Sequence, residues 1–137
     1  MYLVYIIIYN NLSYVGMTNN FLNRLQQHNG ILTGGAKYTK KGSNWTPICI
    51  IDGFANKSEA MQCEWKIKSR KSKLSKLYNG IKGRIEYLNL LLNDDKWTSK
   101  SPLIIDQRLH IYIVDKYKYL LTNYTQKNII LRELYFE

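Results

Sequence analysis

The sequence predicts an α+β fold, in which a small, mostly antiparallel sheet of three strands is flanked by helices and followed by an accessory region. Three observations support this class. Two β-rich apolar runs, 2–9 and 12–17, lie on either side of a two-residue turn. Two later segments begin with helix-capping residues, and no repeat or low-complexity linker divides the 137 residues. A chain of this length forms one domain, or a small domain with a supporting extension.

The first two strands form a predicted hairpin. Residues 2–9 are apolar on both alternating faces, which is typical of a strand covered on both sides. The asparagines at 10 and 11 accept positive φ and suit a two-residue turn. This register places Gly16 opposite Tyr5, with Tyr14 diagonal to it on the same face, and we expect Gly16 to leave open space beside the Tyr5 ring. Two phenols then point into one pocket, although aromatic core packing would explain the same pair.

A helix is predicted after the hairpin. Residues 18–20 are of helix-capping types, the helix continues to about Asn29, and Gly30 is a suitable terminator. Arg24 and His28 are spaced i, i+4 and share one helix face. Arg24 is the only charged residue among the first 36. We therefore expect a specific partner for it, against the alternative of an exposed arginine followed by a histidine near the helix end.

The middle of the chain predicts one more strand and a long helix. A loop rich in Gly, Lys and Thr covers 31–46, and a short apolar strand follows over 48–51. Asn56 and Glu59 have the spacing of a capping box, with Asn in place of Ser or Thr. They begin a basic helix that we expect to extend to about Leu77.

Beyond this helix the pattern is weaker. Gly80 and Gly83 are expected to break the helix, and residues 84–92 to form a short one. A strand is expected over 109–113, and 128–136 has the composition of either a strand or a helix. We therefore divide the chain into a main domain, 1–83, and an accessory region, 84–137, which is rich in Leu, Ile and Tyr and packs on the core.

The net charge of +10 is concentrated in the central third. Residues 37–84 hold twelve Lys and Arg against three acids, whereas 85–137 hold seven of each sign. A concentrated positive field suits a polyanion, most simply nucleic acid. The alternative is a solvated lysine-rich surface produced by codon bias, but codon bias does not explain why the charge avoids both ends of the chain.

Other classes are disfavoured. The longest apolar run, 2–9, is too short to span a bilayer, and no basic segment precedes it as in a signal peptide. We expect a soluble intracellular protein with no membrane partner. Cys49 and Cys63 lack the paired spacing of a zinc site and are interpreted as buried, reduced thiols.

Glu64 is one of only three acids in the basic third and stands between apolar neighbours, Cys63 and Trp65. A carboxylate in that setting either pairs with a nearby lysine or holds a divalent metal. A hard cation takes oxygen ligands and keeps several waters when protein ligands are few.

These segments together resemble the GIY-YIG nucleases. The resemblance rests on Val4-Tyr5-Ile6, Tyr14-Val15-Gly16-Met17-Thr18, Arg24-Leu25-Gln26-Gln27-His28-Asn29 and Glu64. It covers about residues 2–80. Val replaces the Gly of the first triplet and the Ile of the second, but both tyrosines are present. Within the superfamily, the chain is most similar to the nuclease subunit of the Slx structure-selective endonuclease and to small UvrC-like proteins.

The resemblance implies a metal-dependent endonuclease of repair or recombination that cuts branched DNA, such as a flap, a fork or a four-way junction. It implies catalytic roles for Tyr5, Tyr14, Arg24, His28 and Glu64, with Glu64 holding one Mg²⁺ or Mn²⁺. Tyr5, Tyr14 and His28 each remain candidates for the general base. The location implied is the nucleus, or a cytoplasmic replication site if the source is viral. The Slx subunit carries a zinc-binding module after its nuclease domain, but this chain has no cysteine after Cys63, so the need for a scaffold partner stays open.

The central lysines are the predicted DNA contacts, because phosphate contacts position a duplex without reading its bases. The predicted nucleic-acid-binding residues are Lys37, Lys40, Lys41, Trp45, Lys66, Lys68, Arg70, Lys71 and Lys73, with Trp45 proposed to stack on an unpaired base or to pack in the core. The region 85–137 is a candidate homodimer surface. The alternatives are a non-catalytic nucleic-acid-binding module of the same fold and a sequence-specific restriction-type enzyme. A homing enzyme fits less well, because no DNA-reading extension is recognisable.

Overall fold

The computed structural model describes residues 1–69 and 76–136. Three predicted DNA contacts, Arg70, Lys71 and Lys73, therefore lie outside the described residues. The strands are β1 (Leu3–Tyr9), β2 (Leu12–Thr18), β3 (Thr46–Asp52), β4 (His110–Ile113) and β5 (Ile130–Glu133). The helices are α1 (Phe21–His28), α2 (Lys57–Lys68), α4 (Gly80–Leu92), α5 (Ile104–Gln107) and α6 (Asp115–Lys118), with 3-10 turns η1 (Tyr38–Lys41) and η2 (Tyr124–Lys127).

The strands form one sheet in the order β2-β1-β3-β4-β5. All neighbours are antiparallel except β4 and β5, which are parallel. The α+β class is confirmed, but the sheet has five strands and not three, because the C-terminal strands continue it beyond β3. The hairpin register is also as predicted: Tyr5 pairs with Gly16, and Asn10 has a φ of 53° in the turn.

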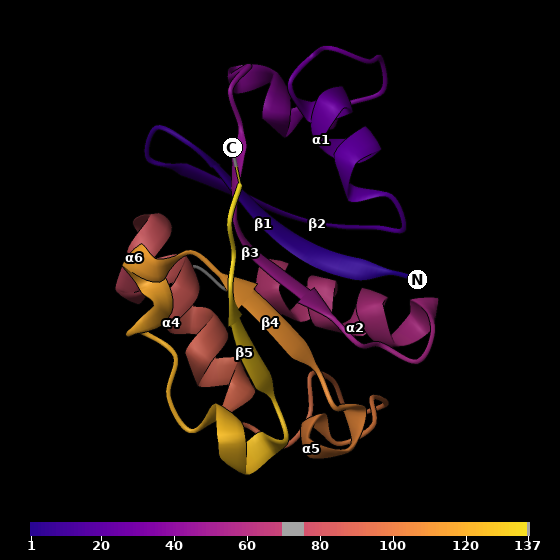
Figure 1. The fold of residues 1–137 in the computed structure, drawn as a ribbon, viewed down its shortest axis with the longest axis vertical. Coiled ribbons are helices and arrows are strands. Elements are labelled where there is room, and N and C mark those ends of the chain that lie inside the picture. The colour runs from indigo at the N-terminus through magenta and orange to yellow at the C-terminus, as the bar shows by residue number, and fades with distance from the viewer. Residues whose placement is uncertain (70–75, 137) are drawn as a thin grey trace.

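Helices cover the two faces of the sheet unequally. One face packs against α2 and α4 and forms the larger core, which includes Ile6, Cys49 and Leu88. The other face forms a smaller cluster around Tyr5, Ile7, Leu25 and Trp45, under α1 and the loop that follows it. Figure 1 shows α1 on one side of the hairpin and α2 and α4 on the other. The hairpin is therefore covered on both faces, as its apolar pattern predicted.

Helix α2 begins as predicted and ends earlier. The Asn56 side chain accepts a hydrogen bond from the Glu59 backbone N–H at 3.0 Å, which confirms Asn56 as the N-cap, and it donates to the Glu59 carboxylate at 3.2 Å, where a capping box would use the Asn56 backbone N–H. The helix ends at Lys68 and not at Leu77. The Nη1 group of Arg84 donates to the Ile67 carbonyl at 3.1 Å, so an arginine of α4 satisfies a carbonyl in the last turn.

Gly83 does not break a helix, contrary to expectation. Helix α4 begins at Gly80 and continues through Gly83, which is buried against the backbone of Tyr78. A Cβ at this position would overlap the Tyr78 carbonyl carbon. Gly83 therefore permits a close chain approach inside α4. The strand predicted over 109–113 is β4, and the segment left as strand or helix contains strand β5.

Both cysteines are buried and free, as interpreted from the sequence. Burial raises the pKa of the Cys49 thiol to about 12, so it stays protonated and unreactive at neutral pH. Within the part of the chain that the structure describes, no helix has the length and apolar character needed to cross a bilayer.

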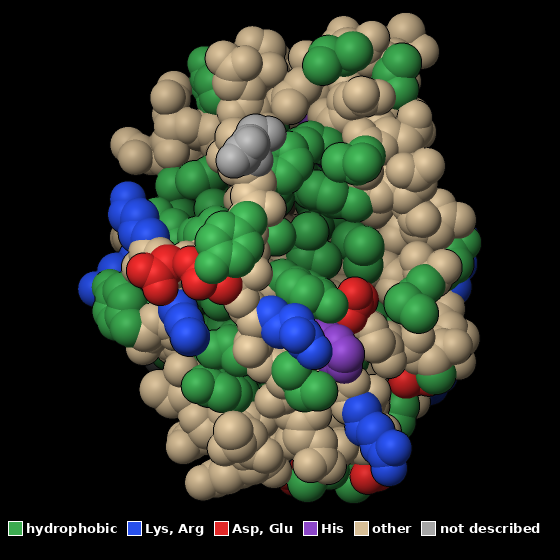
Figure 2. Space-filling view, in the orientation of Figure 1, with side chains coloured by type: hydrophobic (Ala, Val, Ile, Leu, Met, Phe, Trp, Pro, Cys, Tyr) green, Lys and Arg blue, Asp and Glu red, His purple; other side chains and the backbone are tan. Residues whose placement is uncertain are grey.

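The surface in Figure 2 is not a continuous basic face. Hydrophobic side chains gather over the middle of this face, and the Lys and Arg side chains are scattered over its left and lower parts, one of them beside a His side chain. On this face the basic side chains are therefore interspersed with acidic and apolar ones.

Candidate active site

Tyr5 is a buried phenol at the centre of the hairpin. Its side chain is only 1 % exposed, and its ring lies directly over Gly16 of the neighbouring strand. A Cβ at Gly16 would overlap the phenolic oxygen and the carbon that carries it. The expectation of open space beside the ring is therefore wrong, since the ring itself fills the space that the glycine leaves.

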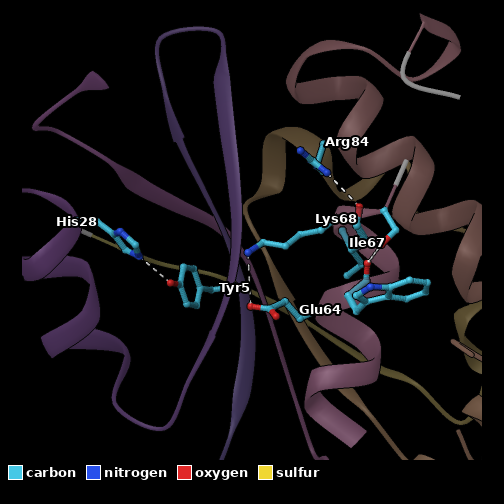
Figure 3. Close-up of polar contacts among 8 residues, drawn as sticks. Tyr5, His28, Glu64, Ile67, Lys68 and Arg84 are labelled. Carbon is cyan, nitrogen blue, oxygen red and sulfur yellow. Dashed lines mark hydrogen bonds and ion pairs between the residues drawn. The ribbon is translucent and has the colours of Figure 1, made fainter. Parts of the chain in front are cut away.

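His28 joins Tyr5 to the loop. The Tyr5 hydroxyl lies 2.7 Å from Nε2 of His28, as Figure 3 shows, and Nδ1 of the same ring lies 2.8 Å from the Thr39 hydroxyl. His28 is the last residue of α1, and Thr39 lies in η1. All three side chains are buried. Two ring nitrogens, a phenol and a hydroxyl thus form one continuous chain of buried hydrogen bonds.

Tyr14 lies beside this chain, as its diagonal position predicted. Its ring centroid is 5.0 Å from that of His28 and 6.4 Å from that of Tyr5. Both distances are within the range of favourable aromatic contacts. Tyr14 is half-buried, so it forms the boundary between the buried pair and solvent.

Tyr14 is also part of a column of rings and cations. It stacks on Tyr38 with centroids 6.0 Å apart, and Lys41 Nζ lies 4.3 Å from the centre of the Tyr38 ring. On the Tyr14 ring, Lys68 Nζ lies 4.8 Å from the centre. Each ammonium is within the range of a cation–π contact. Each ring of the stacked pair is therefore in contact with one ammonium group, at the border of the site.

Arg24 has the specific partners expected for an isolated charge. Its Nη1 donates to the Gln27 side-chain oxygen and to the Gly34 carbonyl, each at 2.8 Å. These bonds join α1 to the following loop and restrict the guanidinium. It lies close enough to Tyr5 and His28 to act on the pKa of both.

Glu64 reaches the site from the opposite face of the sheet. It lies on α2, where Lys68 Nζ is 3.8 Å from its carboxylate, at side-chain exposures of 24 % for Glu64 and 40 % for Lys68. In Figure 3 both side chains extend from α2 toward the strand that carries Tyr5. Lys68 in turn contacts the Tyr14 ring, so the carboxylate is joined to the tyrosines through one lysine and does not lie on the far side of the molecule.

The donor set around Glu64 fits a metal that is held mainly by its substrate. Among the residues that the structure describes, no three His, Cys, Asp or Glu side chains cluster into a metal site. Mg²⁺ is commonly bound through one or two carboxylates, substrate phosphates and waters. The partly exposed Glu64 carboxylate can supply the single protein ligand of such an ion.

Burial favours the neutral form of both Tyr5 and His28, and nearby positive charge adds to this effect at His28 alone. Desolvation, then the charges of Arg24 and Lys68, lowers the pKa of His28 to about 4. Desolvation raises the pKa of Tyr5 well above its ordinary value, with Arg24 acting in the opposite direction. In the resting site both groups are therefore uncharged at neutral pH.

Trp45 is packed in the core, where its ring is not available to stack on a base. Its side chain is 1 % exposed, and its indole N–H donates to the Thr39 carbonyl at 2.9 Å. Asn29 holds its backbone, accepting from the Trp45 N–H at 2.6 Å and donating to the Trp45 carbonyl at 3.1 Å. Base stacking is therefore wrong for Trp45, and core packing is the correct alternative.

The other predicted DNA contacts lie in two places. Lys37, Lys40 and Lys41 are exposed on and beside η1, next to the site. Lys66 points away from Glu64 on α2, because two residues along a helix correspond to more than half a turn. It lines a hollow with Tyr87 and other residues of α4. The structure therefore groups the η1 lysines and Lys68 with the site and separates Lys66 from them.

Sequence reasoning missed Thr39, Tyr38 and Gln27. Thr39 is fully buried although it lies in a loop of alternating Lys and polar residues, where periodicity gives no indication of burial. Tyr38 is one of twelve tyrosines, and its stacking on Tyr14 depends on how the loop folds back. Gln27 directly precedes His28, and only the position of the Arg24 guanidinium shows that the Gln27 side chain accepts a hydrogen bond from it.

Comparisons with known proteins agree with this geometry. Residues 1–79 match the family model described as the GIY-YIG catalytic domain. The chain is 46 % identical to structure-specific endonuclease subunit slx1 of Schizosaccharomyces pombe over 52 residues, which are 38 % of this chain and 19 % of that protein. It is 45 % identical to the SLX1 homolog subunit of Leishmania infantum over 53 residues, 38 % of this chain and 8 % of that protein.

A longer match is with uncharacterized protein L300 of Acanthamoeba polyphaga mimivirus, at 34 % identity over 111 residues, covering 77 % of this chain and 65 % of that protein. The chain spans less than a fifth of the length of the Slx1-type relatives that it matches. The family model, by contrast, covers more than half of the chain and includes both tyrosines, Arg24, His28 and Glu64. This chain therefore belongs to the GIY-YIG family.

Proposed function

We propose that the protein is a DNA endonuclease that hydrolyses phosphodiester bonds in branched DNA with the help of one divalent metal ion. The observation that carries this proposal is the mutual contact of Tyr5, Tyr14 and His28 in a GIY-YIG fold. Arg24 lies close enough to act on the pKa of Tyr5 and His28, and Glu64 is joined to the Tyr14 ring through Lys68. The names of the similar proteins, structure-specific endonuclease subunits, support branched DNA as the substrate class.

Tyr5 and His28 supply the path for the proton of the attacking water. The Tyr5 oxygen accepts this proton as its own proton passes to Nε2 of His28, 2.7 Å away. Before substrate binds, the positive charges of Arg24 and Lys68 help to keep the pKa of His28 low. A bound phosphodiester places negative charge near these cations and raises the affinity of the imidazole for a proton.

Arg24 stabilises the charge that develops on the phosphoryl oxygens. A fixed guanidinium is effective in this role because little reorganisation is needed during the reaction. The bonds from Arg24 to Gln27 and Gly34 provide that rigidity. Tyr14, packed on His28, limits the orientations of the imidazole.

Glu64 would hold the metal ion, Mg²⁺ or Mn²⁺. When bound, such an ion polarises a phosphoryl oxygen and stabilises the leaving oxygen as a Lewis acid. Lys68 lies beside the same carboxylate. Once a metal ion is bound to Glu64, the Lys68 ammonium would be free to turn toward a phosphate.

The lysines beside the site bind the backbone of the substrate. Lys37, Lys40 and Lys41 lie on the loop side of the stacked tyrosines, and Lys68 lies on the helix side. Phosphate contacts of this kind carry no base information, so the DNA is recognised by its shape. Binding should weaken steeply with salt, and each lost lysine should reduce the salt slope by about one.

The test is a cleavage assay with the purified chain. Flaps, forks, four-way junctions and linear duplex are incubated with Mg²⁺, Mn²⁺ or EDTA, and with Glu64→Gln and Arg24→Lys variants. Glu86→Gln and Arg132→Lys, away from the site, serve as matched controls. We expect cutting of branched DNA that requires the metal, with a loss of at least about 100-fold in both site variants.

Each other outcome has a defined meaning. Tight binding without cutting in any divalent metal would indicate a non-catalytic module, and cutting of linear duplex at one sequence would indicate a restriction-type enzyme. Cutting that appears only when a second protein is added would indicate that a partner subunit completes the activity.

A further inference from the structure

We propose that Thr39 is a positioning residue that fixes the tautomer of His28, holding the proton on Nδ1 so that the bare Nε2 accepts the Tyr5 proton. The inference deepens the proposed function and assigns the direction of each hydrogen bond in the buried chain. It rests on the arrangement of four groups: Tyr5, His28, Thr39 and the Ala36 carbonyl.

A proton count determines the direction. The Thr39 hydroxyl has one hydrogen, and it donates this hydrogen to the Ala36 carbonyl at 2.8 Å. The same oxygen is 2.8 Å from Nδ1 of His28, and it can therefore only accept there. Nδ1 then carries the hydrogen of the neutral imidazole. Nε2 carries the lone pair and accepts the Tyr5 O–H at 2.7 Å.

The Ala36 carbonyl has no hydrogen to donate, so the hydrogen between it and the Thr39 hydroxyl belongs to Thr39. This also fixes the direction of the hydrogen bond between Thr39 and His28. The Ala36 carbonyl also accepts the Thr39 backbone N–H at 3.1 Å, which keeps it aimed at the same residue. The Thr39 carbonyl is held separately by the Trp45 indole at 2.9 Å. With 0 % exposure, Thr39 has no water with which to exchange these partners.

The cations near His28 favour the same arrangement. Arg24 and Lys68 act on the ring from the α1 and α2 sides and disfavour a second proton on it. Tyr5 and Tyr14 are the other titratable groups facing the imidazole. A neutral ring has only one hydrogen to place, and Thr39 provides the acceptor for it.

The first experiment reads the tautomer directly and needs no DNA. Long-range ¹H–¹⁵N spectra distinguish Nδ1–H from Nε2–H imidazoles, and the chain has only two histidines, so His110→Gln assigns the signals. We expect the Nδ1–H form in the wild-type protein and in Thr39→Ser. Thr39→Val, which keeps the volume but loses the acceptor, should shift the ring to Nε2–H, whereas exposed Thr33→Val should change nothing.

The second readout is cleavage. Thr39→Val should lower kcat by about 10- to 100-fold with little change in KM, and Thr39→Ser should recover most of the rate. An Nε2–H ring in the wild-type protein, or an unchanged Nδ1–H ring in a folded Thr39→Val, would overturn the proposal. Should Thr39→Val fail to fold, the wild-type and Thr39→Ser spectra still decide it. A confirmed tautomer without any DNA cutting would instead refute only the proposed function.

Discussion

At the scale of single residues, the geometry of the site depends on the absence of a side chain at Gly16, because the Tyr5 ring packs against this glycine. The Tyr5 ring occupies the volume that any other side chain at 16 would need. This packing holds the phenolic oxygen 2.7 Å from Nε2 of His28. The glycine is therefore part of the active-site geometry although it has no functional group.

Gly16→Ala is predicted to displace Tyr5 and to lower the cleavage rate by at least about 100-fold. The added methyl group should also cost about 1–3 kcal/mol of folding free energy through overpacking. Cleavage assays and urea unfolding measure the two effects. Ser58→Ala, at an exposed position of α2 that makes no contact with the site residues described above, is the control. Wild-type activity in folded Gly16→Ala would show that the Tyr5 position is not critical.

The second prediction at this scale concerns pH. The pKa of His28 is about 4 in the folded protein against an ordinary 6.5, so the unfolded chain binds more protons between these values. The contribution of His28 to stability is complete above pH 6.5 and is lost as the pH falls toward 4. Between pH 7 and pH 5 the unfolding free energy should drop by about 2 kcal/mol from this group.

Urea unfolding at several pH values checks this, with His28→Gln as the reference. The variant keeps a hydrogen-bonding group but does not titrate, so the wild-type protein should lose more stability on acidification than the variant does. Equal losses would mean that His28 is not held neutral by its surroundings.

At the scale of elements, a series of hydrogen bonds joins the end of α1 to the loop after it. Asn29 holds the Trp45 backbone, Trp45 holds the Thr39 carbonyl, and Thr39 holds the His28 ring. Since His28 and Asn29 are adjacent in sequence, these contacts close a ring of interactions. A loop without regular structure over most of its length is thereby fixed against a helix.

Trp45→Phe is predicted to weaken this ring with little loss of buried volume. Removing the indole N–H leaves the Thr39 carbonyl with the Gly42 backbone N–H, at 3.3 Å, and loss of the indole hydrogen bond should destabilise the protein by about 0.5–1.5 kcal/mol. Thermal unfolding measures this, and hydrogen exchange should show faster exchange in η1 than in β4. Trp65→Phe is the matched control, because Trp65 is 60 % exposed. Equal effects of the two variants would contradict the role of Trp45.

The sequence predicts the secondary-structure elements and the residues of the candidate site to different extents. The hairpin, α1 and the start of α2 were predictable because turn and capping residues act locally. The end of α2 was not, since its last turn is completed by Arg84 from another helix. The five proposed catalytic residues could be named from spacing and family resemblance. The role of Thr39 could not, and the sequence left the burial of Trp45 as one of two alternatives, because both follow from the path of an irregular loop.

At the scale of the whole molecule, the sheet extends beyond the matched family domain. The family model ends at residue 79, but β4 pairs with β3 through Cys49–Ile113 and Ile51–Ile111. Buried Leu88 and Leu109, both beyond residue 83, belong to the same core as Ile6. The C-terminal region is therefore a structural part of the sheet and the core on which the site is built.

A chain cut after residue 83 is accordingly predicted to lose cooperative unfolding. It would expose one edge of β3 and remove part of the apolar core on which α2 packs, including Leu88 of α4. Calorimetry and the dispersion of ¹H–¹⁵N spectra test this, with deletion of 135–137 as the control that keeps β5. A truncated 1–83 chain with a sharp thermal transition would show that the first part folds independently.

The two edges of the sheet have different surroundings. Beside β2, Lys68 lies on the Tyr14 ring, and Arg84 donates to the Ser13 hydroxyl at 3.1 Å, so side chains from α2 and α4 crowd this margin. Strand β5 is mostly exposed. Addition of a foreign strand is therefore more favourable at β5 than at β2, although Arg132 and Glu133 oppose flat stacking of copies. Self-association at β5 would take place at the edge of the sheet that is separated from Tyr5 on β1 by strands β3 and β4.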